Sequence, residues 1–500
     1  MAQKLQTRNT VVGIKKEVTE GTPVSPAATT DYIAVHEGFT VEPAFEEIEN
    51  AELQASIGKT KGILGFENPT FNFSHYMRAS GVEGQAPNFG ALLESNLGAI
   101  STAAAEYNTV AASTTSIIKV DAGEGATFER GEGLLIKDGV NGYAVRNVLS
   151  VSTDDLNLAQ NLGTAPALGV NLGKAILYKV AESDHPTISS WIYRANKGAI
   201  ELVIGGRVTE MSVDATAGQP IIGSFTVAGI EYKFDPIEIT ASNKYIDFDD
   251  GGGEENVSVA VGFYKDPYEL AAAIQTAIQA ATTDVITVSY SDSTRKFTIT
   301  SDGATFELLF LTGTNNASAI DLTIGYSHTD HTAAITYTSD SALSFASPYT
   351  PEYDSEQPLV AKNNHVMIGS ASEYVCFGAS RVSITSSLES TPVTNLCAAS
   401  GKSGTQPIGR TITFEVEAYL EEGQAEEFRR YRENEEIMFT YTSGRRSGGN
   451  WVPGSIMNYF SPTSRISAFS LVDGDGIVKL NMTVQAYVSN GLGEFYINCL

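Results

Sequence analysis

Cysteine, basic residues and long apolar runs are all scarce in this chain, and each shortage excludes a class of protein. Three cysteines in 500 residues cannot build a disulfide scaffold, and their odd number is typical of synthesis in a reducing cytoplasm. Lys and Arg number 32 against 59 Asp and Glu, and the net charge of −27 argues against a duplex-binding surface. No apolar run approaches the length of about 18 residues that spans a membrane, and the N-terminus lacks the apolar stretch of a secretory signal.

The residues that are abundant favour a folded, strand-rich protein. Hydrophobic residues make up 42% of the chain, enough to bury a core. The 46 glycines and 44 Tyr and Phe residues, with many Thr, Ser and Val, are typical of strands and tight turns. A length of 500 residues is too great for one ordinary domain. We therefore expect a mainly β, multidomain chain.

An internal repeat is the strongest signal along the chain. The segment 39–77 aligns without a gap on the segment 343 positions later, so that Glu46 matches Glu389 and Gly58-Lys59 matches Gly401-Lys402. Residues 207–213 (RVTEMSV) match RISAFSL at an offset of 258, and the segment from Ser224 matches that from Asn481 at 257. The same order of two segments at both ends of the chain predicts a duplicated domain.

The offset between the copies falls from 343 to 258, so the front copy contains extra residues between its two matched segments. A second insert lies between the two copies. The front copy then consists of 1–108 and 182–236, the back copy is 346–500, and the inserts are 109–181 and 237–345. The first insert consists of short strands with Gly turns and predicts a small all-β module. The second mixes strands with one helix after Asp266, where Asp caps, Pro267 begins the first turn and Leu270, Ile274 and Ile278 form a buried stripe. It predicts an α+β module.

Each copy should contain paired strands followed by one helix. Alternating residues at 70–77 and 410–420 predict strands with one apolar and one polar face. Helices are expected at 87–97, with Phe89, Leu92 and Leu93 inward, and at 424–434, with Phe428 and Tyr431 inward. The loops between the paired strands, 46–68 and 389–409, are long for hairpins, which suggests a function for them.

No motif supports catalysis, a cofactor or a metal. The strings Gly58-Lys59-Thr60 and Gly401-Lys402-Ser403 lack the earlier glycine of a phosphate loop, and strands rather than helices follow them. The six histidines form no metal-ligand set, since only His328 and His331 are close. The acidic, Gly-rich run 247–255 lacks EF-hand spacing and favours a hairpin tip. We expect no enzyme.

Three stretches resemble the major tail tube proteins of long, non-contractile-tailed bacteriophages. They are VGIKKEVTEGTPVSPAATTDYIAVHEGFTVEP, GKTKGILGFENPTFNFSHYMRASGVEGQAPNFGALLESNLGA and GRVTEMSVDATAGQPIIGSFTVAGIEY. The resemblance covers both copies, about two thirds of the chain, through strand and turn patterns in a shared order. It implies a mainly β protein with two tandem tail-tube β-sandwich or barrel domains, each with one flanking helix, decorated by the two inserts.

The family resemblance also implies partners and sites. Rings of such subunits stack into a hollow virion tube, assembled in the host bacterial cytoplasm, through which DNA passes without specific binding; tape measure, tail terminator and distal tail proteins are the other partners. Closing sheets across subunits removes exposed edges, and negative charge repels the duplex. The polar strand face makes Glu415 and Glu417 candidates for the lumen. Ring-to-ring contacts are expected from residues 1–30 and from both long loops, with Glu46, Lys59, Glu389 and Lys402 as candidates.

The duplication predicts how many chains form a ring. If single-copy relatives place six domains around the channel, three duplicated chains supply the same six, in a trimeric ring with pseudo-sixfold symmetry; a hexamer is the alternative. The inserts, too large for a lumen, should lie outside. A virion receptor- or glycan-binding β-protein is a second interpretation, which the duplication disfavours. A carbohydrate-active enzyme is a third, and it would need paired carboxylates in a groove.

Overall fold

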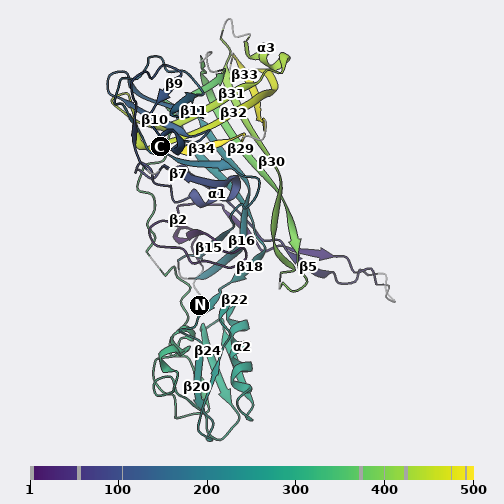
Figure 1. Ribbon diagram of the computed structural model, residues 1–500. Helices are drawn as coiled ribbons and strands as arrows, with labels where there is room; N and C mark the ends of the chain where they lie inside the picture. The colour runs from purple at the N-terminus through teal and green to yellow at the C-terminus, as the bar shows by residue number, and fades with distance from the viewer. Residues whose placement is uncertain are drawn as a thin grey trace. The chain divides into compact units, whose positions relative to one another are not determined.

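The computed structural model describes most of the chain as two compact units. The described residues are 5–52, 58–103, 105–196, 198–348, 350–370, 375–398, 400–421, 426–474, 476–489 and 493–500. The smaller unit contains 1–13, 190–204 and 231–350, and the larger contains 14–189, 205–230 and 351–500. Strands dominate both units, which confirms the predicted mainly β fold (Figure 1).

The larger unit holds most of the strands. Its front part comprises β2 (Tyr32–Ile33), β3 (Thr40–Glu42), β4 (Phe45–Ile48), β5 (Ile63–Glu67), β6 (Thr70–Tyr76), α1 (Gly90–Leu97), β7 (Gly98–Thr102), β14 (Ile176–Val180) and β17 (Ile222–Ala228). Its back part comprises β27 (His365–Gly369), β28 (Val375–Cys376), β29 (Ala379–Thr394), β30 (Lys402–Tyr419), α3 (Glu426–Glu433), β31 (Ile437–Ser447), β32 (Asn450–Gly474), β33 (Ile477–Ala486) and β34 (Tyr496–Cys499). Strands β1 (Val11–Lys16), β15 (Ile188–Arg194) and β16 (Ala199–Thr216) run across the division between the units.

Eight antiparallel strands of an 18-stranded sheet form the centre of the larger unit. Their order is β3-β6-β17-β16-β29-β30-β33-β32, with each neighbouring pair in antiparallel register. The first four strands come from the front copy and the last four from the back copy. β3 therefore lies at one edge of this sheet and the second half of β32 at the other.

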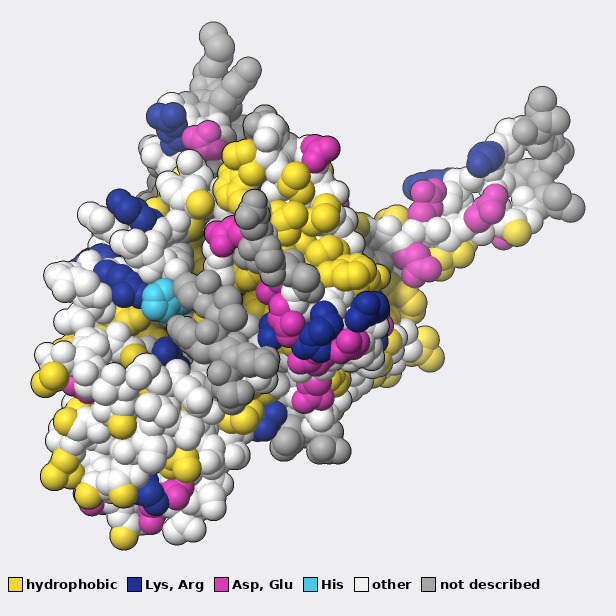
Figure 2. Space-filling view, turned by 90° about the horizontal axis from the view of Figure 1, so that it is seen from above, with side chains coloured by type: hydrophobic (Ala, Val, Ile, Leu, Met, Phe, Trp, Pro, Cys, Tyr) yellow, Lys and Arg dark blue, Asp and Glu magenta, His cyan; other side chains and the backbone are white. Residues whose placement is uncertain are grey.

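Two prolines bend the front hairpin away from this sheet. In the back copy, β29 and β30 pair continuously through Ser386 and Ile412. The front copy has Pro43 and Pro69 at the corresponding positions, and the strands break there into β3 and β4, and into β5 and β6. Proline has no N–H to donate to a ladder, so pairing stops at both positions. The β4–β5 hairpin consequently projects from the sheet (Figures 1 and 2).

The helices of the two copies differ in how far their apolar side chains are covered. In α1 the predicted inward residues are confirmed, because Phe89, Leu92 and Leu93 are at most 2% exposed. In α3 the prediction was wrong: Phe428 and Tyr431 are 48% and 39% exposed. Tyr431 stacks on the ring of Phe469 of β32 and Phe428 meets the same ring edge-on, which leaves their outer faces uncovered. Glu427 and Arg430 are buried instead. Positions 424 and 425 of the predicted helix lie outside the described residues.

The first insert folds as a six-stranded module that packs on the back copy. Its strands are β8 (Tyr107–Asn108), β9 (Ile117–Lys119), β10 (Gly133–Asp138), β11 (Gly142–Ser152), β12 (Asp155–Leu158) and β13 (Asn171–Leu172), in the order β8-β13-β10-β11-β12-β9. Leu135 and Val145 share a buried cluster with Trp451 and Leu500 of the back copy. The next strand, β14, pairs with β7 and β34, so the module ends near residue 172, before the predicted boundary of 181.

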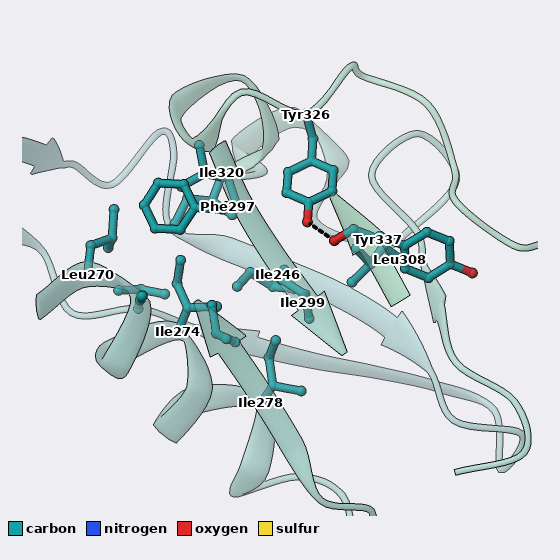
Figure 3. Packing of buried hydrophobic residues seen from close by; sticks show 14 of the residues in the cluster. Ile246, Leu270, Ile274, Ile278, Phe297, Ile299, Leu308, Ile320, Tyr326 and Tyr337 are labelled. Atoms are coloured by element: carbon teal, nitrogen blue, oxygen red, sulfur yellow. Dashed lines mark hydrogen bonds between the residues drawn. The ribbon is translucent and has the colours of Figure 1, made fainter. Parts of the chain in front are cut away.

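The smaller unit has its own core. It contains β18 (Glu231–Phe234), β19 (Ile237–Ile239), β20 (Tyr245–Asp249), β21 (Glu254–Ser258), β22 (Gly262–Tyr264), α2 (Pro267–Gln279), β23 (Ile286–Ser291), β24 (Lys296–Ser301), β25 (Glu307–Leu308) and β26 (Thr336–Thr338). Asp266 caps α2 by accepting from the backbone N–H of Glu269 at 2.7 Å, as predicted. Leu270, Ile274 and Ile278 point into the apolar cluster between α2 and the strands (Figure 3), which confirms the predicted stripe.

Candidate assembly interface

The two predicted copies share the same strand register, as a duplication requires. Phe73 lies opposite Phe225 in the β6–β17 pair. Their counterparts in the back copy, Val416 and Met482, lie opposite each other in β30–β33. The copies therefore match residue by residue along these strands.

An irregularity of the sheet is repeated as well. The β16–β17 ladder shifts register between Val208 and Glu210. The β32–β33 ladder shifts between Ile466 and Ala468, which are the counterparts 258 positions later. A β-bulge re-aims the strand that carries it, so both copies bend their last strand at the same point.

The two copies join edge to edge within the chain. β16 pairs with β29 over seven residues, with Val213 opposite Ile384. Met211, Val213 and Ile384 are all fully buried at this junction. On the other face Arg381 donates to Asp214 through Nε at 2.8 Å and to Glu417 at 3.2 Å, and these carboxylates raise the pKa of the guanidinium. We call this β16–β29 contact the intrachain junction.

The corresponding edges at the two ends of the sheet are uncovered. Leu471 of β32 is the counterpart of Val213, and it is 53% exposed where Val213 is fully buried. Phe45 is the counterpart of Leu388, and it is 47% exposed where Leu388 is 3% exposed. Apolar side chains at two free sheet edges are an association site or a liability. Figure 2, seen from the α3 end, shows hydrophobic side chains gathered beside a charged cluster.

Both lumen candidates lie on one face of the sheet. Phe414, Val416 and Ala418 are buried, whereas Glu415 is exposed and Glu417 is half-buried beside Arg381. The same face of the front copy is a shallow polar hollow, lined among others by Thr40, Asn72, Ser74, Glu210, Ser212 and Thr226. The predicted alternation along β30 is therefore present, and the face it defines is polar and acidic.

The four loop candidates divide into three exposed residues and one buried residue. Glu46 on β4, Lys59 and Glu389 on β29 are exposed. Lys402 is 5% exposed and donates from Nζ to the side-chain oxygen of Asn68. Burial lowers the pKa of Lys402, and the negative charges of Glu46 and Glu67 act in the opposite direction. Lys402 is thus engaged within the chain. Residues 53–57 and 399 of the two predicted loops lie outside the described residues.

The repeated Gly-Lys pair has a structural explanation in the back copy. Gly401 has a φ of +77°, and a Cβ there would lie 2.5 Å from the ring of Phe66. Only glycine permits both the left-handed backbone and this close approach. The sequence pattern did identify a repeated loop, and it contained no signal for Phe66 as the partner.

The described part of the chain contains neither a metal-binding cluster nor a membrane-spanning helix. Among those residues no three His, Cys, Asp or Glu side chains are grouped so that they could hold a metal ion. None of the described helices has the length and apolar character needed to cross a membrane.

Comparisons with known proteins give only partial likenesses. No family model matches the chain, and no curated protein does. Three solved structures cover 26–27% of this chain and 76–96% of their own: the virion of a native gene transfer agent particle, the SPP1 tail tube and an Hcp protein. Their sequence identities are 11–15% and their TM-scores 0.17–0.19. At these TM-scores the likeness carries no conclusion about function.

Proposed function

We propose that this chain is a self-assembling structural subunit whose sheets close into rings that stack as the tail tube of a virion. The intrachain junction is the observation that carries the proposal. It joins the four strands of the front copy edge to edge with the four strands of the back copy. The edge strand at each far end, β3 and the second half of β32, has no such neighbour among the described residues. A contact that can be repeated head to tail closes into a ring when the rotation matches.

The number of chains in the ring follows from the duplication. Three chains supply six equivalent copies of the domain in a pseudo-sixfold ring. Half of the contacts between copies are then intramolecular. The covalent connection gives these contacts a high effective concentration. A hexamer of chains would double the number of units and widen the channel.

The acidic face that carries Glu415 and Glu417 would line the channel. Double-stranded DNA carries its charge on the phosphates, and negative charge on the wall disfavours binding. The chain as a whole has a net charge of −27. DNA would therefore pass without specific recognition, which suits a conduit.

Stacking of rings would use the exposed ends of the two long hairpins. Glu46, Lys59 and Glu389 are exposed there. In the N-terminal segment Val11, Val12 and Ile14 of β1 are buried, which leaves the exposed residues on either side of β1 as candidates. Tape measure, terminator and distal tail proteins would bind at the inside and the ends of the tube.

Negative-stain electron microscopy of the purified chain tests the proposal. We expect tubes or stacked rings, and a cross-section with three chains per ring. A ring of six chains would refute the stoichiometry and leave the tube function standing. Monodisperse single chains at all concentrations and salts would refute the function.

A charge variant tests the channel assignment in virions. Glu415→Lys should retard DNA release without preventing tube formation, because Glu415 is exposed and packs nothing in the sheet. Glu415→Gln is the matched control and should behave almost as the unaltered protein. Equal release from both variants would contradict the placement of Glu415 in the lumen.

A further inference from the structure

We infer that the free edge of β32 pairs with β3 of a second copy of this chain, antiparallel, with Leu471 opposite Val41 of that copy. The inference rests on the proposed function and adds the partner strand and its register. It places Ser470 opposite Glu42 and Val472 opposite Thr40, where Glu42 and Thr40 belong to the second copy.

The register follows from the repeat alone. In the intrachain junction Val213 lies opposite Ile384, and Ser212 opposite Thr385. The offset of 258 takes Val213 to Leu471, and the offset of 343 takes Ile384 back to Val41. Because both copies share their bulge and their internal registers, the same junction built from the counterpart strands has no freedom to slip by one residue. Such a slip would turn every apolar side chain to the wrong face.

Both strands are available for pairing in the described part of the chain. Among the described residues, β3 pairs with β6 alone, and the segment Ala468–Gly474 of β32 pairs with β33 alone. Their counterparts β29 and β16 each have a second partner, which is the other strand of the intrachain junction. An edge strand exposes a row of N–H and C=O groups to any strand that fits.

The side chains at the two edges fit the same conclusion. Leu471 and Val472 are 53% and 44% exposed on β32, and Phe45 is 47% exposed just beyond β3. Val213, the counterpart of Leu471, is fully buried in the intrachain junction, where a second strand pairs with β16. A second copy would cover Leu471 in the same way.

The exposed face of α3 has the same explanation. In the intrachain junction α1 of the front copy contacts β29. The equivalent contact sets α3 against β3 of the second copy. Phe428 and Tyr431, which are exposed and contact the ring of Phe469, lie on the helix that would then be covered. The apolar side chains of α3 therefore serve the contact between chains.

The two junctions differ in charge, which separates them experimentally. The intrachain junction has the Arg381–Asp214 ion pair, and the counterparts of these residues are Gly38 and Val472. The junction between chains would depend on apolar burial and strand pairing. Added salt should favour it, because screening weakens the repulsion between chains that each carry a net charge of −27.

Engineered cysteine pairs test the register in the assembled protein. In a background with Cys376 and Cys397 replaced by serine, Ser470→Cys with Glu42→Cys should give covalent dimers and trimers on mild oxidation. The shifted pair Ser470→Cys with Thr40→Cys keeps the same face but adds about 7 Å along the strand. That exceeds the reach of a disulfide, so its yield should be at least tenfold lower.

An intrachain pair is the matched positive control. Ser212→Cys with Thr385→Cys lies at the equivalent place in the intrachain junction, so it should form a disulfide within one chain. Visible rings with cross-linking only in the shifted pair would overturn the register and leave the tube function intact. Rings without any interchain cross-link would overturn the pairing of these two edges. Absence of both rings and cross-links would overturn the proposed function as well.

Discussion

Replacing Asn458 by alanine should separate the first insert from the back copy. The side-chain oxygen of Asn458 accepts from Asn147 of the insert at 2.7 Å and from Asn498 at 3.2 Å, and its amide donates to Thr442 at 2.9 Å. Asn147, Asn458 and Asn498 are fully buried. The alanine removes three hydrogen bonds worth about 1 kcal/mol each, so the free energy of unfolding of this unit should fall by about 3 kcal/mol.

Tryptophan fluorescence during urea unfolding is a direct assay. The chain has two tryptophans. Trp451 is 2% exposed and shares its cluster with Leu135 and Val145 of the insert, so its emission reports separation of the insert. Trp191→Phe removes the other signal, which comes from the smaller unit.

Asn157→Ala is the matched control for this prediction. Asn157 lies on β12 of the same module, and its amide makes a single 3.4 Å hydrogen bond to the carbonyl of Ser150. Its loss should cost less than about 0.5 kcal/mol. If Asn458→Ala were no more destabilising than Asn157→Ala, the buried amide network would not hold the insert in place.

Three further variants test separate parts of the argument. Burial raises the pKa of Glu132 to about 7. The unfolded chain therefore loses this proton at lower pH than the folded chain, and the free energy of unfolding should fall between about pH 4.5 and 7. Glu132→Gln should flatten this part of a pH–stability curve, and an unchanged curve would refute the assignment. Gly401→Ala should cost about 1–3 kcal/mol, since it strains a φ of +77° and meets Phe66, and proteolysis of the hairpin tips should accelerate; an unchanged rate would contradict this. Pro43→Ser with Pro69→Ile, the residues of the back copy, should make the front strands continuous and protect their amides from hydrogen exchange; unchanged protection would show that the prolines do not cause the break.

Local sequence patterns predicted the elements well where one element buries its own face. The stripe of Leu270, Ile274 and Ile278 follows from helical spacing, and Asp266 follows from capping chemistry. The predicted inward face of α3 was wrong because that helix does not bury its own apolar face within the chain. Phe428 and Tyr431 have core-like spacing, yet the free chain leaves them half uncovered, and spacing alone does not say whether a neighbouring element or another chain covers a face.

The candidate interface could be predicted only in part. Alternation along β30 identifies the polar face of Glu415 and Glu417, because successive side chains of a strand point to opposite faces. It contains no information on Arg381, which reaches Asp214 across the intrachain junction. Lys402 was expected at an exposed loop, and its burial beside Asn68 depends on a hairpin more than 300 residues away in the chain.

The sequence by itself determined the class of fold, and it predicts a duplication and the places of two inserts. Composition, alternation and a repeat at fixed offsets are properties of the chain order, so they can be read before folding. Tertiary structure decided which edges meet: that β16 pairs with β29, that the first insert shares its core with the back copy, and that β3 and β32 remain open. Strand pairing depends on hydrogen bonds between distant segments, and backbone N–H and C=O groups are the same in every residue but proline. Only the folded sheet therefore shows which strand each edge pairs with.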